Sequence, residues 1–376
     1  MLRPERTERL ASPTDVALCR QLLRAGSRTF FAASLILPTG LRAPSAGLYA
    51  FCRVADDAVD QGADGAAALS RMRFRLESVY RGKPDDQAVD RVFADAVRQS
   101  AIPAEIPRAL LEGFAWDVER RSYQTLADLE CYAVRVAGTV GLMMALLMGV
   151  RDHATLAAAC DLGMAMQLTN IARDVGEDAQ NGRLYLPRDW LREEGIDPEL
   201  WLARPVHSAA LARVVARLLS AADELYTAAE PGIGALPASC RPGMRAARLL
   251  YAEIGREVAR GGCDSISRRA VVSWQRKARI LADAMVRRAP SPAAPGAAAP
   301  GAAAPGAAAP VRAPLPAAAF LIDCAAGSDA DQPAATLEST RERLRWPRLE
   351  DRITWLIDLF ERLERSERAR VGVANP

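Results

Sequence analysis

Apolar residues recur at intervals of three and four positions from about residue 14 to residue 287, in segments rich in Ala, Leu, Arg and Glu. Alternation with a period of two is scarce there, so the pattern predicts helices rather than strands. Six prolines fall where these helices are expected to begin or end, namely Pro38, Pro44, Pro103, Pro187, Pro198 and Pro231. We therefore predict an all-α fold, with one helical bundle domain over residues 14–287.

The pattern changes after this domain. The stretch APSPAAPGAAAPGAAAPGAAAPVRAPLP repeats a PGAAA unit, and each proline removes a backbone donor and blocks the preceding turn. Residues 288–316 are thus predicted to be a low-complexity tether of irregular or polyproline-like form. In the last segment, 317–376, helical spacing predicts an amphipathic helix with Leu349, Ile353, Leu356, Ile357, Phe360 and Leu363 on one face.

Two roles remain open for this C-terminal helix. We favour packing back on the main domain, because apolar stripes are usually buried. Docking on a membrane surface or on a second copy is the alternative, although the mixed Arg and Glu face gives little attraction to anionic lipid.

Charge and composition narrow the function classes. The 49 basic and 46 acidic side chains nearly balance, and no basic tract interleaves with aromatic residues, so nucleic acid is not an expected partner. The seven cysteines are scattered without a CxxC pair, which predicts reduced thiols rather than disulfides or a zinc site. The charged N-terminus does not resemble a signal peptide, and the apolar stretch 136–150 is too short for a membrane span. A cytoplasmic location is expected.

Two stretches place carboxylates within apolar surroundings at helical spacing. In YAFCRVADDAVD (49–60) a helix would align Tyr49, Arg53, Asp56 and Asp60, with Asp57 off this stripe. In GMAMQLTNIARDVGED (163–178) it would align Gly163, Gln167, Asn170, Asp174 and Asp178. Four buried carboxylates are costly unless each finds a cation or the faces stay wet.

A metal site is the interpretation that the two stretches favour together. If the helices face one another, the four carboxylates would hold hard divalent ions such as Mg²⁺, which takes oxygen ligands and is often shared with substrate phosphates. Arg28, Arg53 and Arg173 could then hold the anion released when a diphosphate leaves.

Five stretches carry a family resemblance: SRTFFAASLILP (27–38), YAFCRVADDAVD (49–60), YAVRVAGTVG (132–141), QLTNIARDVGEDAQNGRLYLP (167–187) and YAEIGREVARGGCDSISRRA (251–270). They resemble the squalene and phytoene synthase family, and the DVGEDA and GRLYLP wording is most similar to its bacterial phytoene synthases. The resemblance covers roughly residues 15–285. It implies the isoprenoid synthase (class I terpenoid) fold and a prenyltransferase of carotenoid biosynthesis. This enzyme would join two geranylgeranyl diphosphates head to head, through prephytoene diphosphate, to phytoene.

The resemblance also implies roles for individual residues. Asp56, Asp60, Asp174 and Asp178 match the carboxylates that bind metal and diphosphate, and Asn170 is expected to join them as a metal ligand. Substrate contacts are implied for Arg28, Phe30, Tyr49, Arg53, Gln167, Asn170, Arg173 and Tyr251. Tyr132 is expected to be catalytic. An allylic cation needs a dry cavity and can be stabilised by aromatic faces, for which Phe30 and Tyr132 are candidates; core packing is the alternative for both.

Some positions leave alternatives open. Gly138 and Gly141 interrupt a good helix, either for a tight helix crossing or for access by an isoprenoid chain, and the resemblance favours the second. Cys263 stands where tyrosine is usual, and Gly26 and Arg28 where some relatives have histidine and lysine. These departures remove no metal ligand. His153 and His207 lie outside the motifs, with no partner constellation for catalysis.

Rival functions differ in substrate or in class. A C30 synthase making squalene or dehydrosqualene from farnesyl diphosphate would differ in cavity depth, which spacing does not reveal. Squalene formation would need NADPH, and no GxGxxG fingerprint follows a strand, although the squalene enzymes need not use that dinucleotide-binding fold. No NADPH is expected for phytoene formation. A non-catalytic scaffold would not be expected to keep all four carboxylates. Mg²⁺ is the expected cofactor, with Mn²⁺ as the alternative. The insoluble product implies contact with the inner face of the membrane and with downstream carotenoid enzymes.

Overall fold

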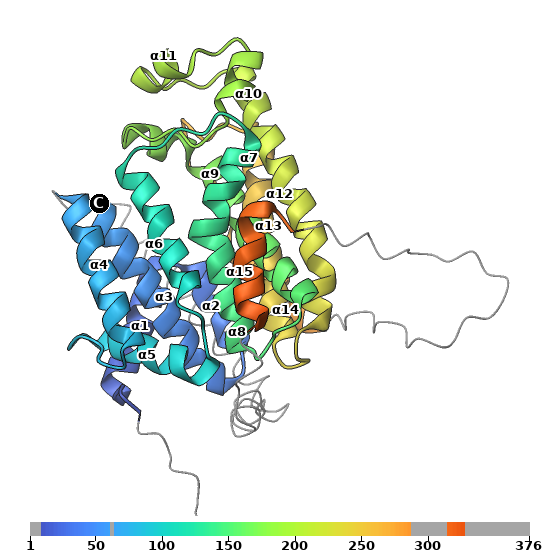
Figure 1. Cartoon of the computed structure of the whole chain (residues 1–376). Helices are drawn as coiled ribbons and strands as arrows, with labels where there is room; N and C mark the ends of the chain where they lie inside the picture. Colours follow the sequence, from blue (N-terminus) through green and yellow to red (C-terminus); the bar gives the residue numbers. More distant parts are fainter. Residues whose placement is uncertain (1–8, 61–63, 287–313, 328–376) are drawn as a thin grey trace, which may run out of the picture.

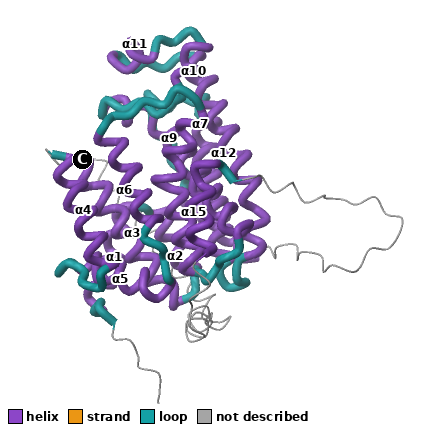
Figure 2. Tube along the Cα trace, viewed as in Figure 1, coloured by secondary structure: helices purple, strands orange, loops and turns teal. Residues whose placement is uncertain are grey.

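The computed structural model of the chain describes residues 9–60, 64–286 and 314–327. In these ranges every regular element is a helix and no strand is present, which confirms the all-α prediction (Figure 2). The first half comprises α1 (Pro13–Gly26), α2 (Arg28–Ile36), α3 (Thr39–Asp60), α4 (Gly65–Tyr80), α5 (Ala88–Ser100), α6 (Glu105–Val118) and α7 (Leu126–Ala133). The second half comprises the π-helical η1 (Val134–Gly138), α8 (Thr139–Leu147), α9 (His153–Gln180), α10 (Arg188–Glu193), α11 (Pro198–Ala203), α12 (Ala209–Ala235), α13 (Arg241–Arg260), α14 (Trp274–Val286) and α15 (Pro316–Ala326).

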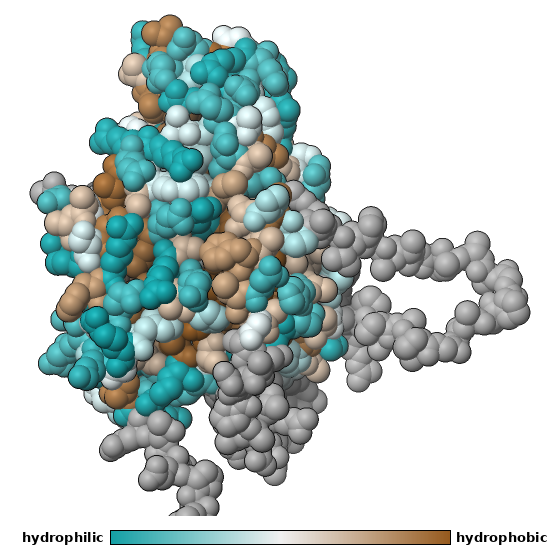
Figure 3. All heavy atoms as spheres, in the orientation of Figure 1, coloured by the Kyte–Doolittle hydropathy of each residue, from teal (hydrophilic) through white to brown (hydrophobic). Residues whose placement is uncertain are grey.

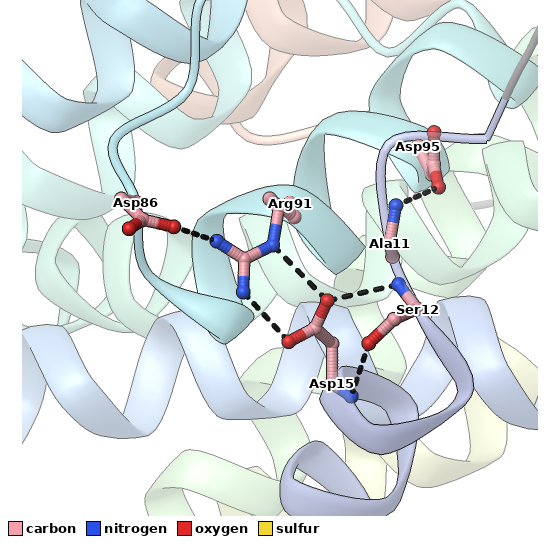
Figure 4. Close-up of polar contacts among 6 residues, drawn as sticks. All are labelled: Ala11, Ser12, Asp15, Asp86, Arg91 and Asp95. Carbon is pink, nitrogen blue, oxygen red and sulfur yellow. Dashed lines mark hydrogen bonds and ion pairs between the residues drawn. The ribbon is translucent and has the colours of Figure 1, made fainter.

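The start of the bundle is held by a capping network. Ser12 caps α1 by accepting from the backbone N–H of Asp15, and the Asp15 carboxylate accepts from the N–H of Ser12. Figure 4 shows Arg91 of α5 between Asp15 and Asp86, with its Nη2 2.7 Å from Asp15 Oδ1. Arg91 lowers the pKa of Asp15 well below its usual value. The network ties α1 to α5 beneath the rest of the bundle.

Helix α9 runs through the centre of the bundle and contacts α12, α8, η1 and α13 (Figure 1). Its crossing with η1 and α8 requires glycine. A Cβ on Gly141 would lie 2.1 Å from the Ala159 carbonyl oxygen, and one on Gly138 would lie 2.7 Å from Cys160 Sγ. Both glycines therefore allow a tight helix crossing. Gly141 also borders the cavity described below, so the chain-access role that the resemblance favours stays a prediction.

The helical run α7–η1–α8, residues 126–147, is longer than the apolar stretch singled out in the sequence. By length and composition it could cross a membrane, the one such run among the described residues. However, 67% of its most apolar window is buried inside the fold, against α9 and α6 among others. The run therefore lies in the fold as a core helix of the bundle.

The prolines divide into two groups. Pro38, Pro103 and Pro187 precede α3, α6 and α10, and Pro198 begins α11, as predicted. The prediction was wrong for Pro44 and Pro231, which lie inside α3 and α12. Each removes one backbone hydrogen bond, and burial of the rest of each long helix against the core keeps it continuous.

Helix α15 was not predicted as such, and it packs on the main domain beyond the tether. Leu321 and Ile322 are buried, and the helix contacts α9, α6, α8 and η1. Asp323 Oδ1 lies 3.2 Å from His153 Nε2 at the start of α9. Hydrophobic residues are exposed on the face around α15 in Figure 3, where Phe320 is half-exposed. Most of the predicted tether and the predicted helix at 349–363 lie outside the described residues, so the domain boundaries stay predictions.

Candidate functional site

A cavity of about 200 Å³ lies between α2, α3, η1, α8, α9, α12 and α13. Its wall consists mainly of aliphatic side chains and small residues, such as Leu48, Val140, Met144 and Leu162. Five residues expected to contact substrate border it: Phe30, Tyr49, Gln167, Asn170 and Tyr251. The structure thus brings together residues from four helices that lie up to about 220 positions apart in the sequence.

The polar groups of the cavity wall near α3 are neutral. Phe30 and Tyr49 stack with ring centroids 5.8 Å apart. Burial raises the pKa of the Tyr49 hydroxyl to about 12, and it raises that of the neighbouring Cys52 thiol to about 12. Both groups therefore keep their protons at neutral pH. This part of the cavity wall therefore presents the aromatic faces of Phe30 and Tyr49, and neither Tyr49 nor Cys52 carries a charge there.

The first carboxylate motif, on α3, is half-exposed. Arg53 Nη2 lies 2.6 Å from Asp57 Oδ1, and Arg53 Nη1 lies 3.5 Å from Asp56 Oδ2. The side chains of Arg53, Asp56 and Asp57 keep 39, 41 and 36% of their surface exposed. Asp57, which lies off the predicted stripe, therefore orients Arg53.

The second carboxylate motif, on α9, is more buried and is paired across elements. Asp174 is 16% exposed and accepts hydrogen bonds from the neighbouring Arg173 and from Arg269, whose Nε lies 2.8 Å from Asp174 Oδ1. Burial opposes ionisation of Asp174, but the hydrogen bonds from these two arginines outweigh it and lower its pKa. For Asp178, burial and the nearby charge of Asp174 raise the pKa to about 8. Asp178 thus holds a proton at neutral pH unless a cation compensates it.

Arg269 was missed by the sequence analysis, although it stands in the quoted SISRRA stretch. The segment after α13 is fastened to α9, because Gly176 N–H donates to the Ser265 carbonyl at 3.0 Å and Ser265 Oγ donates to the Ala172 carbonyl at 2.6 Å. A Cβ on Gly176 would lie 2.8 Å from that Ser265 oxygen. The close crossing carries Arg269 onto Asp174. The sequence did offer one signal: buried carboxylates such as Asp174 need compensating cations, and Arg269 stands in a quoted motif.

Tyr132 lies outside the lining of the cavity. Its hydroxyl donates to Asp117 Oδ2 at 2.9 Å, while the Tyr185 hydroxyl donates to Asp117 Oδ1 at 2.7 Å. The rings of Tyr132 and Tyr185 stack at 5.2 Å, and Tyr123 packs against both. Burial raises the pKa of Tyr132 well above its usual value, so it stays a neutral phenol. Asp117 and Tyr185 had not been singled out, because nothing in their local spacing links them.

Two expected site residues are placed only by their backbone. Arg28 is the first residue of α2, and Asp60 is the last residue of α3; their side chains lie outside the described part of the structure. Among the described residues, no group of three or more His, Cys, Asp or Glu side chains lies close enough to hold a metal ion. The four-carboxylate cage therefore stays a prediction.

Comparison with known proteins adds independent information. The sequence model of the family described as Squalene/phytoene synthase matches residues 23–277. The phytoene synthase of Rhodobacter capsulatus is 52% identical over 278 residues, which cover 73% of this chain and 82% of that protein. The phytoene synthase of Cereibacter sphaeroides is 49% identical over 327 residues, covering 84% of this chain and 89% of that protein.

Solved structures show the same fold. A dehydrosqualene synthase in complex with ligand superposes with a TM-score of 0.66 at 30% identity, over 72% of this chain and 95% of that chain. Squalene synthase HpnC from Alicyclobacillus acidocaldarius superposes with a TM-score of 0.61 at 26% identity, over 66% of this chain and 94% of that chain.

Proposed function

This chain belongs to the squalene/phytoene synthase family, and we propose that it joins two molecules of geranylgeranyl diphosphate head to head, through prephytoene diphosphate, to phytoene. It is a prenyltransferase-type enzyme whose substrate is a prenyl diphosphate. Identity near one half to two proteins named phytoene synthase supports the C40 product. The carotenoid pathway is the metabolic setting of that product.

The observation that carries the proposal is the junction between an apolar cavity and a charged helix stripe. Gln167 and Asn170 border the cavity, and Asp174 and Asp178 follow on the same face of α9, one to two turns further along. An isoprenoid chain fits the apolar part, and its diphosphate would lie at the charged end. This division matches the two chemical halves of a prenyl diphosphate.

The donor set fits a hard divalent cation. The expected ligands Asp56, Asp60, Asp174, Asp178 and Asn170 supply only oxygen atoms of carboxylate and amide groups, which Mg²⁺ prefers over softer sites; Mn²⁺ is the alternative. Asp178 lies among groups that hold its pKa at about 8, and a cation nearby would let it ionise. When bound, Mg²⁺ would neutralise the charge that develops on the diphosphate oxygen as the carbon–oxygen bond breaks.

The remaining steps depend on the residues of the chain. Arg53, Arg173 and Arg269 present guanidinium groups beside the carboxylates and would hold the departing diphosphate. The stacked faces of Phe30 and Tyr49 would stabilise the allylic cation. The aliphatic wall excludes water, which would otherwise capture this cation.

A C30 product is the second candidate, and one observation favours it. The dehydrosqualene synthase structure is 30% identical and shares the fold over nearly its full length. Such an enzyme would use farnesyl diphosphate with the same residues. The proposals that the enzyme touches the inner face of the membrane and hands its product to carotenoid enzymes follow only from the insolubility of the hydrocarbon. The proposal of a cytoplasmic location rests on the free, scattered cysteines.

Product analysis tests the proposal. Purified full-length protein is incubated with Mg²⁺ and either geranylgeranyl or farnesyl diphosphate, with and without NADPH and with a chelator control. We expect phytoene from the C20 substrate, lost with the chelator and indifferent to NADPH. A C30 product alone would replace phytoene by the second candidate. No product from either substrate, with the fold intact, would favour a non-catalytic scaffold.

A further inference from the structure

A second cavity, of about 40 Å³, lies outside the site described above and is lined by four arginines. Arg120 and Arg121 come from the turn after α6, and Arg183 and Arg188 come from the segment after α9. Asp117, Ser122 and Tyr185 also border it. We call these four arginines and the space between them the arginine pocket.

Arg120 has a backbone conformation that arginine seldom adopts. Its φ is +51°, and it follows the last turn of α6, where the N–H groups of Arg120 and Arg121 bond to carbonyls of that helix. The equivalent positions after α4, α8 and α9 are Gly82, Gly149 and Gly182, all with positive φ. An arginine held in a strained conformation where glycine would serve suggests a role for its guanidinium.

Three of the four guanidinium groups have donors without an acceptor among the described residues: those of Arg120, Arg121 and Arg188, whose Nε is buried without a hydrogen bond. Among the described residues, Arg120 has no carboxylate within ion-pair distance, and Arg121 lies over the Trp116 ring at 4.0 Å. Arg188 pairs with Glu199, and the Asp117 carboxylate accepts from Tyr132 and Tyr185. The carboxyl ends of α6 and α9 add about half a negative charge each. A net positive charge therefore remains, carried by donors at the pocket wall.

The pocket adjoins the second carboxylate motif along the chain. The backbone N–H of Arg183 donates to the Asp178 carbonyl at 2.8 Å, within the turn that ends α9. The Arg120 guanidinium lies beside that turn, since a Cβ built on Gly182 would be in ordinary contact with Arg120 Nη1, at 3.5 Å. At roughly 10–15 Å³ for each water, the volume admits about three oxygen atoms, the size of one phosphoryl group.

We propose that the arginine pocket binds a phosphate oxyanion, either the diphosphate that the reaction releases or inorganic phosphate from solution. The proposal rests on the proposed function only for the diphosphate source. Planar guanidinium groups donate pairs of hydrogen bonds that match phosphate oxygens. Diphosphate leaving the α9 carboxylates would find this pocket at the end of the same helix, outside the apolar cavity.

The test measures anion binding without turnover. Full-length protein in excess chelator at low ionic strength is titrated with inorganic diphosphate and, separately, with inorganic phosphate, by calorimetry. The chelator removes divalent ions, so the carboxylate motifs cannot hold the anion through a metal. The informative variant is Arg120→Gly with Arg121→Gln, because glycine suits the positive φ and the fold should be unharmed.

Two matched controls test whether a change in anion binding comes from the pocket itself, from a relaxed helix end or from the loss of positive charge. Ala101→Gly relaxes another helix end that has a non-glycine residue at positive φ, here +43°, without a change of charge. Arg73→Gln removes one exposed positive charge on α4. We expect at least tenfold weaker diphosphate binding in the double variant and less than twofold change in either control. Affinity of the double variant within twofold of the unmodified protein, or an equal loss in Arg73→Gln, would overturn the proposal.

The two anions separate the sources. Diphosphate bound at least tenfold more tightly than phosphate identifies the reaction product as the ligand, whereas equal affinities identify a single-phosphoryl site filled from solution. Loss of binding in the double variant supports the site in either case. Because no prenyl substrate is present, an enzyme that made no phytoene would leave this result unchanged.

Discussion

On α3, Asp56 and Asp57 pair with Arg53 of their own helix, and all three side chains are more than one third exposed. On α9, Asp174 is 16% exposed and depends on Arg269 from a segment almost a hundred residues away. Both motifs have aspartates at the same helical spacing within apolar surroundings. Their spacing in the sequence predicts the shared face, whereas burial determines their charge: Asp56 on α3 is solvated, and Asp178 on α9 has a pKa of about 8. Asp178 is thus the carboxyl group whose ionisation depends on a bound cation, whereas the arginines beside Asp174 already keep that carboxylate charged.

Removing a carboxylate should give the largest effect on activity. The two motifs should differ in how much each carboxylate contributes to the stability of the fold. We expect Asp56→Ala and Asp174→Ala each to lower turnover by roughly 100- to 1,000-fold. Asp174→Ala should also destabilise the fold by about 1–3 kcal/mol, because two arginines lose their buried partner. Product formation and denaturant unfolding measure the two effects. Unchanged turnover in both variants would defeat the metal cage.

Arg269 tests whether the cross-element pairing matters. Arg269→Gln should lower kcat by about 10- to 100-fold, since it removes one of the two cations on Asp174 and a contact for diphosphate. Arg268→Gln is the matched control, because the Arg268 side chain has no ion pair among the described residues. Equal losses in the two variants would show that general charge, rather than the contact with Asp174, is responsible.

The raised pKa of Asp178 predicts a dependence of stability on pH in metal-free protein. Because this pKa is higher in the folded state than the 3.8 of an ordinary aspartate, folding is favoured when the carboxyl is protonated. The contribution is full below about pH 4 and is lost as pH rises through about 8. After allowance for partial exposure we expect a loss of about 2–4 kcal/mol.

Thermal unfolding with chelator at pH 5 to 8.5 measures this dependence. Asp178→Asn should flatten the curve, and added Mg²⁺ should stabilise most at the high end. A curve that is the same in the Asn variant would assign the dependence to other groups.

A smaller effect should come from Asp117, whose carboxylate accepts from Tyr132 and whose charge contributes to the raised pKa of Asp178. Asp117→Asn replaces a carboxylate that accepts two tyrosine hydroxyls, and we expect a stability loss of about 1–3 kcal/mol with a few-fold lower kcat. The double variant with Tyr132→Phe should lose less than the sum of the single variants, because both act through one hydrogen bond. Additive losses would mean that the two residues act independently.

The smallest effect on activity is expected from the C-terminal segment. Truncation after residue 288 removes α15, which contacts neither carboxylate motif through a hydrogen bond or ion pair found in the described residues. Activity in detergent should stay within about threefold, while exposure of the surface that Leu321 and Ile322 cover lowers the melting temperature. Complete loss of activity in a folded truncation would show that the segment completes the site.

Local spacing predicted the helices and the stripes well, because the period of a helix determines which residues share a face. It could not predict the roles of Arg269 and Asp117, because their partners lie on other elements. It also could not predict α15, because this helix packs on a surface formed by α9, α6, α8 and η1, which are distant in the sequence. It placed Pro44 and Pro231 at helix ends because a proline's lost hydrogen bond is local, whereas the packing that compensates is not. Tyr132 shows the same limit, since its motif alone did not reveal which way its hydroxyl points.

The π-helical segment η1 has a consequence for how this sequence tolerates change. Thr139 N–H reaches back to the Val134 carbonyl, five positions earlier, so the turn holds one residue more than an α-turn. Tyr132, before the wide turn, faces Asp117, while Val136, Ala137 and Val140 line the cavity. Deleting one residue within η1 would let the same carbonyl and N–H close an ordinary α-turn, so the residues before and after it would keep their faces, whereas a deletion within a regular α-helix rotates everything beyond it by about 100°. The wide turn is thus the place in this helical run where the loss of one residue should be tolerated best, because Tyr132 would still face Asp117 and Val140 would still line the cavity.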